Sequence, residues 1–334
     1  MFVKSEAASA LFAGPFALAT LSAQDEPAFP ALVTADGRVL DLRAAFGDGN
    51  LTVRDVLVDW DSAAARLKAL AEGIDGRETR PLARFRVHAP VEPRQVFQSG
   101  ANYRQHVIDL HVAHRAPDDD RPEEERRAEA AEIMDRRAAE DLPYVFIGLP
   151  SAITGPYDDV VLPAWAAQPD WELELAVVIG RPAYRVTAEE ALRHVAGYTI
   201  ANDLTDRATV FRRDMPQIGT DWLRSKNAPG FTPLGPWIVP AGSVADPGDL
   251  RVTLKLNGET MQDESTGDMI FDVARVVSYA SQSARLLPGD LVLTGSPAGN
   301  GMHWGRLLRD GDVLEGSVTG LGVQRTRCVA EDAS

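Results

Sequence analysis

Cysteine is nearly absent from this sequence of 334 residues, in which Cys328 is the only one. A single cysteine cannot form an internal disulfide, and it has no second thiol with which to bind a metal. Nothing beside it in the sequence would lower the pKa of its thiol, so we do not expect a nucleophile there. These features exclude a disulfide-stabilised fold and are typical of a protein from a reducing cytoplasm, where we expect this one.

Positive charge is also scarce. The chain has 34 Lys and Arg residues against 49 Asp and Glu residues, a net charge of -15, and no dense basic run with interleaved aromatic residues. Nucleic acid is therefore not an expected partner. No apolar run reaches the roughly 20 residues that a membrane span needs, so we do not expect a membrane partner either.

The N-terminal segment resembles a secretory signal, with a lysine, an apolar stretch and small residues in "LSAQ". Glu6 and Pro15 argue against that interpretation. From Phe16 to Leu42 the sequence alternates in hydrophobicity and turns at "QDEPA" and "ADG", as antiparallel strands do. We therefore expect strands here rather than a cleaved signal.

The length favours one large domain with a smaller lobe. We expect residues 1–90 to form a small α+β lobe with a helix at Ser62–Gly73, and residues 91–334 to form the main domain. Short strands separated by Gly, Pro and Asp dominate after Pro143, interrupted by one amphipathic helix in "MIFDVARVVSYASQSARLL". No G-x-G-x-x-G motif follows a first strand, which argues against a doubly wound nucleotide fold. The predicted class is α+β, mainly β.

An insertion at about 111–143 is mostly charged between Asp118 and Asp141. Glu123 and Arg127 have opposite charges at helical i,i+4 spacing. Two interpretations stay open: a solvated surface helix, or a lid beside an active site.

Two glutamates two residues apart raise a question about charge. In "WELELAVVIG", Glu172 and Glu174 point to the same face of a strand, about 7 Å apart, so a cation between them would relieve their repulsion. Asp203 follows a second predicted strand. Three carboxylates suit Mg²⁺ first, with Mn²⁺ or Ca²⁺ as alternatives. The competing interpretation is that the two glutamates are solvated charges on an edge strand.

Other segments carry polar residues suited to catalysis. His106 and Asp109 lie three residues apart at a predicted helix start, where a carboxylate can orient an imidazole that acts as a general base. Lys226 precedes a Pro/Gly loop, and "LTGSPAGNG" ends a strand with backbone N–H groups that suit an anion. Taken alone, such a histidine is more often structural, such a lysine is expected at the surface, and such a loop is a weak signal.

Taken together and in order, these segments resemble the fumarylacetoacetate hydrolase family over about Gln98 to Val329, the charged insertion excepted. The matching text is "GANYRQH", "SAITGP", "WELELAVVIG", "GYTIANDLTDR", "SKNAPGFTPLGPWIV", "LNGETMQDESTGDMIFDV" and "LLPGDLVLTGSPAGNG". The resemblance implies a mixed β-sandwich or β-roll domain, a homodimer, and a divalent metal held by Glu172, Glu174 and Asp203.

The resemblance also implies a reaction. The expected substrate is a small anionic keto acid from aromatic or sugar acid catabolism, and the expected enzyme is a hydrolase that cleaves a C–C bond in a 1,3-diketo, acylpyruvate-like acid through an enolate stabilised by the metal. The expected contacts form two groups. His106, oriented by Asp109, would activate water, and Lys226 would hold a developing oxyanion; the substrate-binding residues would be Arg104, Arg207, Thr294, Gly295 and Ser296.

The sequence departs from the family pattern at several positions. Asp109 stands where the family usually has Glu, Gly148 and Leu149 occupy a segment that often carries a lysine, and Ser296 replaces a usual Thr. A decarboxylase or hydratase-isomerase on the same fold therefore remains an alternative. So does a non-catalytic binding protein that uses the metal for folding.

Overall fold

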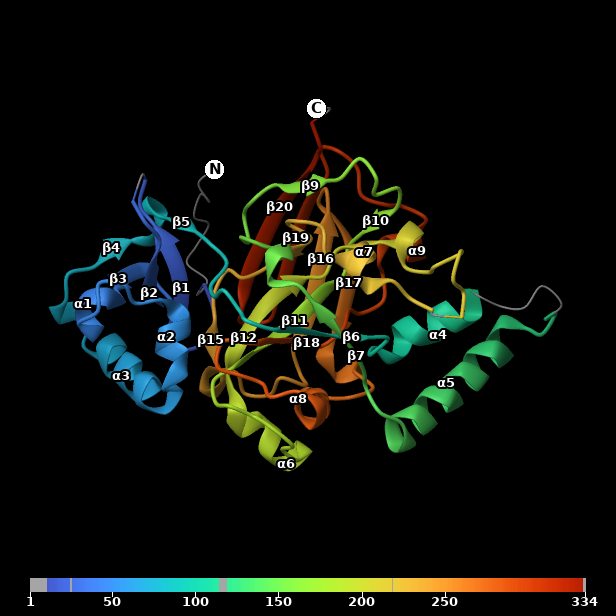
Figure 1. The fold of residues 1–334 in the computed structure, drawn as a ribbon, viewed down its shortest axis with the longest axis horizontal. Coiled ribbons are helices and arrows are strands. Elements are labelled where there is room, and N and C mark those ends of the chain that lie inside the picture. Colours follow the sequence, from blue (N-terminus) through green and yellow to red (C-terminus); the bar gives the residue numbers. More distant parts are fainter. Residues whose placement is uncertain (1–10, 25, 114–118, 218, 333–334) are drawn as a thin grey trace.

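The computed structural model describes residues 11–24, 26–113, 119–217 and 219–332. The first ten residues of the signal-like segment and residues 114–118 of the insertion lie outside the described residues. The chain forms a small lobe and a larger mixed body built on two main sheets (Figure 1). Among the described helices, none combines the length and the apolar character that a membrane crossing requires.

The small lobe is a five-stranded sheet of order β4-β3-β2-β1-β5 with helices against it. Its elements are β1 Phe16–Ser22, β2 Phe29–Thr34, β3 Arg38–Asp41, α1 Leu42–Phe46, α2 Val53–Val58, α3 Trp60–Glu72, β4 Arg80–Pro81 and β5 Arg86–Val87. The strands expected up to Leu42 and the helix expected near Ser62 are both confirmed. Reciprocal backbone hydrogen bonds of 2.9 Å between Leu18 and Ile238 join this lobe to the larger body.

The larger body holds a six-stranded sheet, β15-β12-β11-β18-β6-β7, and a five-stranded sheet, β17-β16-β19-β20-β9. The first consists of β6 Val96–Gly100, β7 Tyr144–Gly148, β11 Leu173–Ile179, β12 Val195–Asn202, β15 Val239–Pro240 and β18 Leu291–Leu293. The second consists of β9 Val160–Leu162, β16 Arg251–Leu256, β17 Glu259–Ser265, β19 Val313–Val318 and β20 Gly322–Ala330. Two short pairs, β10 Pro169–Asp170 with β13 Thr205–Asp206 and β8 Ile153–Thr154 with β14 Thr232–Pro233, complete the strands.

Strand β11 lies in the interior of the body. All seven of its residues are buried, as expected for a strand covered on both faces. The Leu173 side chain packs over Gly316 of β19, where a Cβ would come within 2.4 Å of it. The two sheets therefore approach closely just where the E-x-E motif begins.

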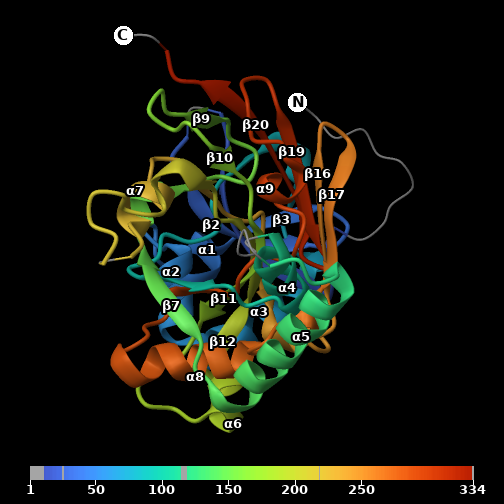
Figure 2. The same cartoon turned by 90° about the vertical axis from the view of Figure 1, so that its right-hand side faces the viewer.

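In the part of the chain that the structure describes, the larger body also has the helices α4 Arg104–Ala113, α5 Glu123–Glu140, α6 Ala188–Ala191, α7 Trp222–Lys226, α8 Val273–Ser283 and α9 Gly301–Trp304. Helix α8 lies within the segment predicted to be helical, and the Asp272 side chain caps its N-terminus by accepting from Arg275 N. Helix α4 carries His106 and helix α7 carries Lys226. Figure 2 shows α7 above β7 and α4 beside α5.

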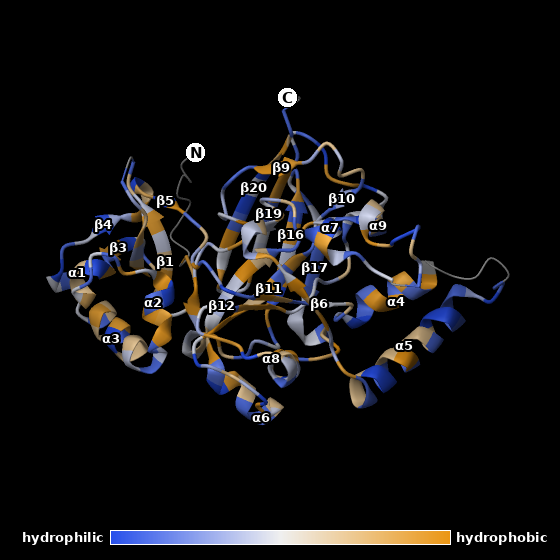
Figure 3. Cartoon of the chain, viewed as in Figure 1, coloured by the Kyte–Doolittle hydropathy of each residue, from blue (hydrophilic) through white to orange (hydrophobic). Residues whose placement is uncertain are grey.

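Helix α5 is the charged insertion, and it is not a plain solvated helix. Most of its surface is hydrophilic (Figure 3), but Arg126, Ala130 and Met134 are buried at a spacing of four residues. This stripe packs toward α4. One face of the insertion therefore belongs to the core, which the charged composition concealed.

Candidate active site

Strand pairing brings the three expected metal ligands together. Glu172 directly precedes β11 and Glu174 is its second residue. Strand β12 runs antiparallel to β11, and Asp203 follows its last residue. The backbone N–H of Asp203 donates to the Glu172 carbonyl at 2.8 Å, which fixes the two residues opposite each other.

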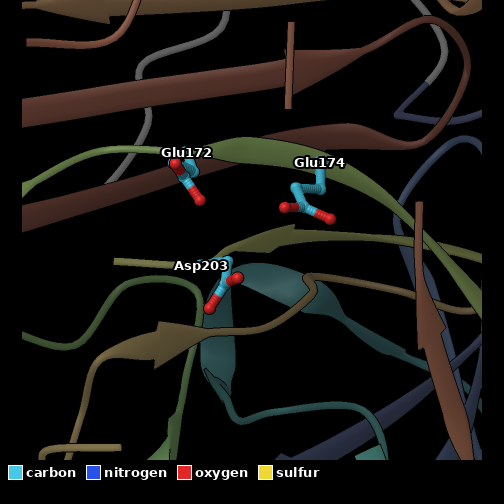
Figure 4. A group of neighbouring side chains, drawn as sticks. All are labelled: Glu172, Glu174 and Asp203. Atoms are coloured by element: carbon cyan, nitrogen blue, oxygen red, sulfur yellow. The ribbon is translucent and has the colours of Figure 1, made fainter. Parts of the chain in front are cut away.

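The three carboxylates share one space. Glu172, Glu174 and Asp203 each offer an oxygen within 4.8 Å of the others, and their carboxylate groups face the same gap (Figure 4). Glu174 and Asp203 are each only 1% exposed. Three carboxylate oxygen donors, two of them from buried residues, with no sulfur or imidazole among them suit a hard divalent cation.

Two cationic side chains reach into this cluster. Lys226 Nζ donates to Glu172 Oε2 at 2.7 Å, to Asp203 Oδ2 at 2.6 Å and to Thr205 Oγ1 at 2.7 Å. Arg207 Nη2 lies 2.6 Å from Glu172 Oε1. Lys226 and Arg207, two of the three expected basic residues, are therefore paired with carboxylates of the cluster.

Asp170 is a buried acid that the sequence analysis missed. Its Oδ2 accepts from Arg207 Nε at 2.8 Å, and its Oδ1 accepts from the backbone of Gly301 at 2.5 Å. With Asp170 included, the site holds four carboxylates, and Lys226 and Arg207 balance only two of them. Ionised, the cluster carries two uncompensated negative charges, which one divalent cation would neutralise.

The pKa values of the three carboxylates are shifted in different directions: those of Glu174 and Asp203 are raised and that of Glu172 is lowered. Burial and the neighbouring Asp203 raise the pKa of Glu174. Burial, opposed by Lys226, raises the pKa of Asp203 to about 6. Burial also acts on Glu172, but Arg207 and Lys226 outweigh it and lower its pKa. Without a bound cation, the cluster therefore retains a proton on Glu174 or Asp203 at mildly acidic pH.

His106 approaches this cluster from α4. Burial, aided by the charge of Arg207, lowers the pKa of His106 to about 4. The imidazole is therefore neutral at pH 7 and able to accept a proton.

Asp109 does not orient His106 in this structure. Its Oδ1 accepts from Gln105 Nε2 at 2.9 Å and from Arg127 Nη1 of α5 at 2.8 Å. Its Oδ2 lies 3.9 Å from His303 Nδ1. Within the described residues, no hydrogen bond joins Asp109 to His106, so the expected orienting contact is absent there.

The remaining expected contacts also have protein partners. Arg104 pairs with Asp135 of α5 at 2.9 Å, which directs its guanidinium toward the insertion. In the glycine-rich loop, Gly295 N donates to Glu174 Oε2 at 2.7 Å, and Thr294 Oγ1 donates to a β11 carbonyl. Ser296 Oγ accepts from Gln262 Nε2 at 2.9 Å. The loop thus holds Glu174 in place.

Gln98 was also missed. Its Nε2 donates to Asp203 Oδ1 at 2.6 Å from the middle of β6. A glutamine that directly follows the apolar pair Val96 and Phe97 in a buried strand is the signal that indicates such a contact.

The family profile and the relatives that match this chain point to the same protein family. Residues 95–329 match the profile described as fumarylacetoacetate (FAA) hydrolase, C-terminal. The 2,4-didehydro-3-deoxy-L-rhamnonate hydrolase of Sphingomonas sp. (strain SKA58) is 42% identical over 186 residues, 55% of this chain and 64% of that protein. The human mitochondrial oxaloacetate tautomerase FAHD2B is 40% identical over 183 residues, 54% of this chain and 57% of that protein. The matched part thus spans less than two thirds of either relative.

Solved structures extend the similarity over nearly the whole chain. A putative HpcE protein from Mycobacterium smegmatis has a TM-score of 0.74 and 31% identity, covering 94% of this chain and 99% of that one. Maleylpyruvate hydrolase from Sphingobium sp. SYK-6, in complex with manganese(II) and pyruvate, has a TM-score of 0.71 and 25% identity, covering 95% and 100%. The expected fold is confirmed by these neighbours.

Proposed function

Because this chain belongs to the fumarylacetoacetate hydrolase family, we propose that it is a divalent-metal-dependent hydrolase that cleaves a C–C bond in a 1,3-diketo acid of the acylpyruvate type. The observation that carries the proposal is the cluster of Glu172, Glu174 and Asp203, whose oxygens lie within 4.8 Å of one another. These three residues would hold the cation, with Mg²⁺ the first choice and Mn²⁺ or Ca²⁺ as alternatives. When bound, the cation supplies Lewis-acid stabilisation of negative charge on the substrate oxygens.

The protein's own groups account for the proton transfers. Neutral His106 takes a proton from water, and the water oxygen attacks the acyl carbonyl of the substrate. The C–C bond then breaks, its electron pair stays with the pyruvate half as an enolate, and a proton returned by the imidazolium completes that product. Lys226, charged because Asp203 and Glu172 outweigh its burial and raise its pKa, stabilises the developing negative charge.

A second candidate is favoured by the contacts of Asp109. Because Asp109 pairs with Arg127 rather than with His106, water activation lacks a carboxylate partner. Moving a proton on the enolate of a 2-oxo acid needs no attacking water. A tautomerase, isomerase or decarboxylase of such an acid is therefore the alternative.

One assay separates these candidates. Acetylpyruvate hydrolysis and oxaloacetate keto–enol conversion are measured with Mg²⁺ and with EDTA. The proposal predicts hydrolysis that disappears with EDTA. Conversion of oxaloacetate without hydrolysis of acetylpyruvate would favour the alternative, and turnover of neither compound, with or without Mg²⁺, would indicate a binding protein. We also propose a homodimer, which sedimentation equilibrium tests.

A further inference from the structure

The side-chain amide of Gln98 has a hydrogen-bond partner for its nitrogen, while its oxygen has none among the described residues. It is 1% exposed in the middle of β6, and its Nε2 donates to Asp203 Oδ1 at 2.6 Å. An ionised carboxylate only accepts hydrogen bonds, so the amide nitrogen is the atom that contacts Asp203, and the carbonyl oxygen is left for another partner.

That carbonyl oxygen, Gln98 Oε1, is buried and has no hydrogen-bond partner among the described residues. A buried amide acceptor left unpaired is costly and is rare in proteins. The contact with Asp203 fixes the orientation of the amide, because rotation by half a turn would place the oxygen against the carboxylate and lose that hydrogen bond. The arrangement is typical of an acceptor that a ligand completes.

Gly148 of β7 provides the space for this amide. A Cβ at position 148 would come within 2.6 Å of Gln98 Oε1 and 2.8 Å of its Cδ. The side chain of any other residue would therefore displace the amide from Asp203. Gln98 and Gly148 are diagonal neighbours on the β6–β7 ladder, in which Val96 pairs with Gly148 and Gln98 pairs with Phe146.

We propose that Gln98 is a specificity-determining residue, whose Oε1 accepts a hydrogen bond from a hydroxyl of the bound ligand. The inference rests on the proposed function, because it places the ligand beside Asp203. A buried amide oxygen attracts a hydroxyl and repels a carboxylate oxygen. The ligand class it selects is therefore an enol or 2-hydroxy acid, the form in which the group next to the chelating carboxylate carries a proton.

The test compares two chelating two-carbon acids, glycolate, which has a hydroxyl donor, and oxalate, which at neutral pH has none. Their affinities are measured by calorimetry with saturating Mg²⁺ on the wild type and on Gln98→Met. The expected result is that glycolate binding weakens about five- to tenfold more than oxalate binding, the worth of one hydrogen bond. Equal weakening of both acids would overturn the proposal, because Gln98 would then act only through Asp203.

Two further variants keep the test decisive. Gly148→Ala approaches the same contact from the neighbouring strand and should cause the same selective loss of glycolate. Gln324→Met removes another buried glutamine, which donates to the Pro233 carbonyl, and should leave the glycolate-to-oxalate ratio unchanged. A Gly148→Ala protein that folds and keeps the wild-type ratio would contradict the inference. If wild-type oxalate affinity did not depend on Mg²⁺, the proposed function would fail instead.

Discussion

The ammonium of Lys226 lies 2.6 Å from Asp203 Oδ2 and donates to it from a side chain that is 3% exposed. Asp203 Oδ2 and Glu172 Oε2, which Lys226 also contacts, belong to the carboxylates that we assign to the cation. Lys226 and a divalent cation therefore compete for the same negative charge.

Removing this competitor should strengthen metal binding. We expect Lys226→Gln to bind Mg²⁺ at least about tenfold more tightly, since one nearby positive charge is lost, while turnover falls. Lys68→Gln removes an exposed lysine from α3 of the small lobe and should leave the affinity unchanged. Calorimetric titration measures both variants, and weaker binding by Lys226→Gln would refute the shared-charge interpretation.

Metal binding should release protons. The pKa values of Glu174 and Asp203 are raised, that of Asp203 to about 6, so part of the metal-free protein is protonated near and below that pH. A cation requires both carboxylates ionised, so Mg²⁺ affinity should fall as the pH drops below about 6 and rise as the pH increases through it. Titrations in two buffers of different ionisation enthalpy count the protons released. A pH-independent affinity between pH 5 and 8 would argue against these carboxylates as ligands.

His106 should matter for catalysis and not for metal binding. Because its pKa is lowered to about 4, the imidazole stays neutral and competent as a base throughout pH 5 to 8. We expect His106→Gln to reduce acetylpyruvate hydrolysis by about 10² to 10⁴-fold with Mg²⁺ affinity unchanged. His111→Gln, on the exposed side of α4, is the matched control. A hydrolysis rate that survives the His106 substitution would remove this residue from the mechanism.

Asp109 and Arg127 should act as one unit. Their 2.8 Å ion pair joins α4 to the insertion helix α5. We expect Asp109→Asn, Arg127→Gln and the double variant to raise the KM for acetylpyruvate by the same few-fold factor, with kcat nearly unchanged. Arg127→Lys, which keeps the positive charge, should raise the KM less than Arg127→Gln does. If Asp109 instead oriented His106, Asp109→Asn alone would lower kcat strongly, and Arg127→Gln would not.

The sequence predicts the parts of the site that depend on local geometry. Glu172 and Glu174 were assigned to one face because alternate residues of an extended chain point the same way. Asp203 was proposed as the third ligand because it follows a second predicted strand, but its position opposite Glu172 depends on the register between β11 and β12, which the sequence pattern does not give. Asp170 and Gln98 were missed because their partners lie 37 and 105 residues away along the chain.

Helix α5 was predicted as a helix but not as part of the core. Its charged residues support a helix through i,i+4 pairs such as Glu123 with Arg127, which has a 2.9 Å contact. Ala130 and Met134 are four residues apart on one face of the helix, but their burial depends on α4, which a local pattern does not reveal. Whether this helix opens and closes as a lid stays a prediction, which the Asp109 and Arg127 variants examine.

The central claim is that one divalent cation is held by three carboxylates with room left for a chelating acid. The most direct measurement is the anomalous difference map of crystals grown with Mn²⁺ and oxalate. We expect one strong peak in contact with Glu172, Glu174 and Asp203, with oxalate on its open side. Carboxylates that keep their pairing with Lys226, with no anomalous peak between them, would contradict the account.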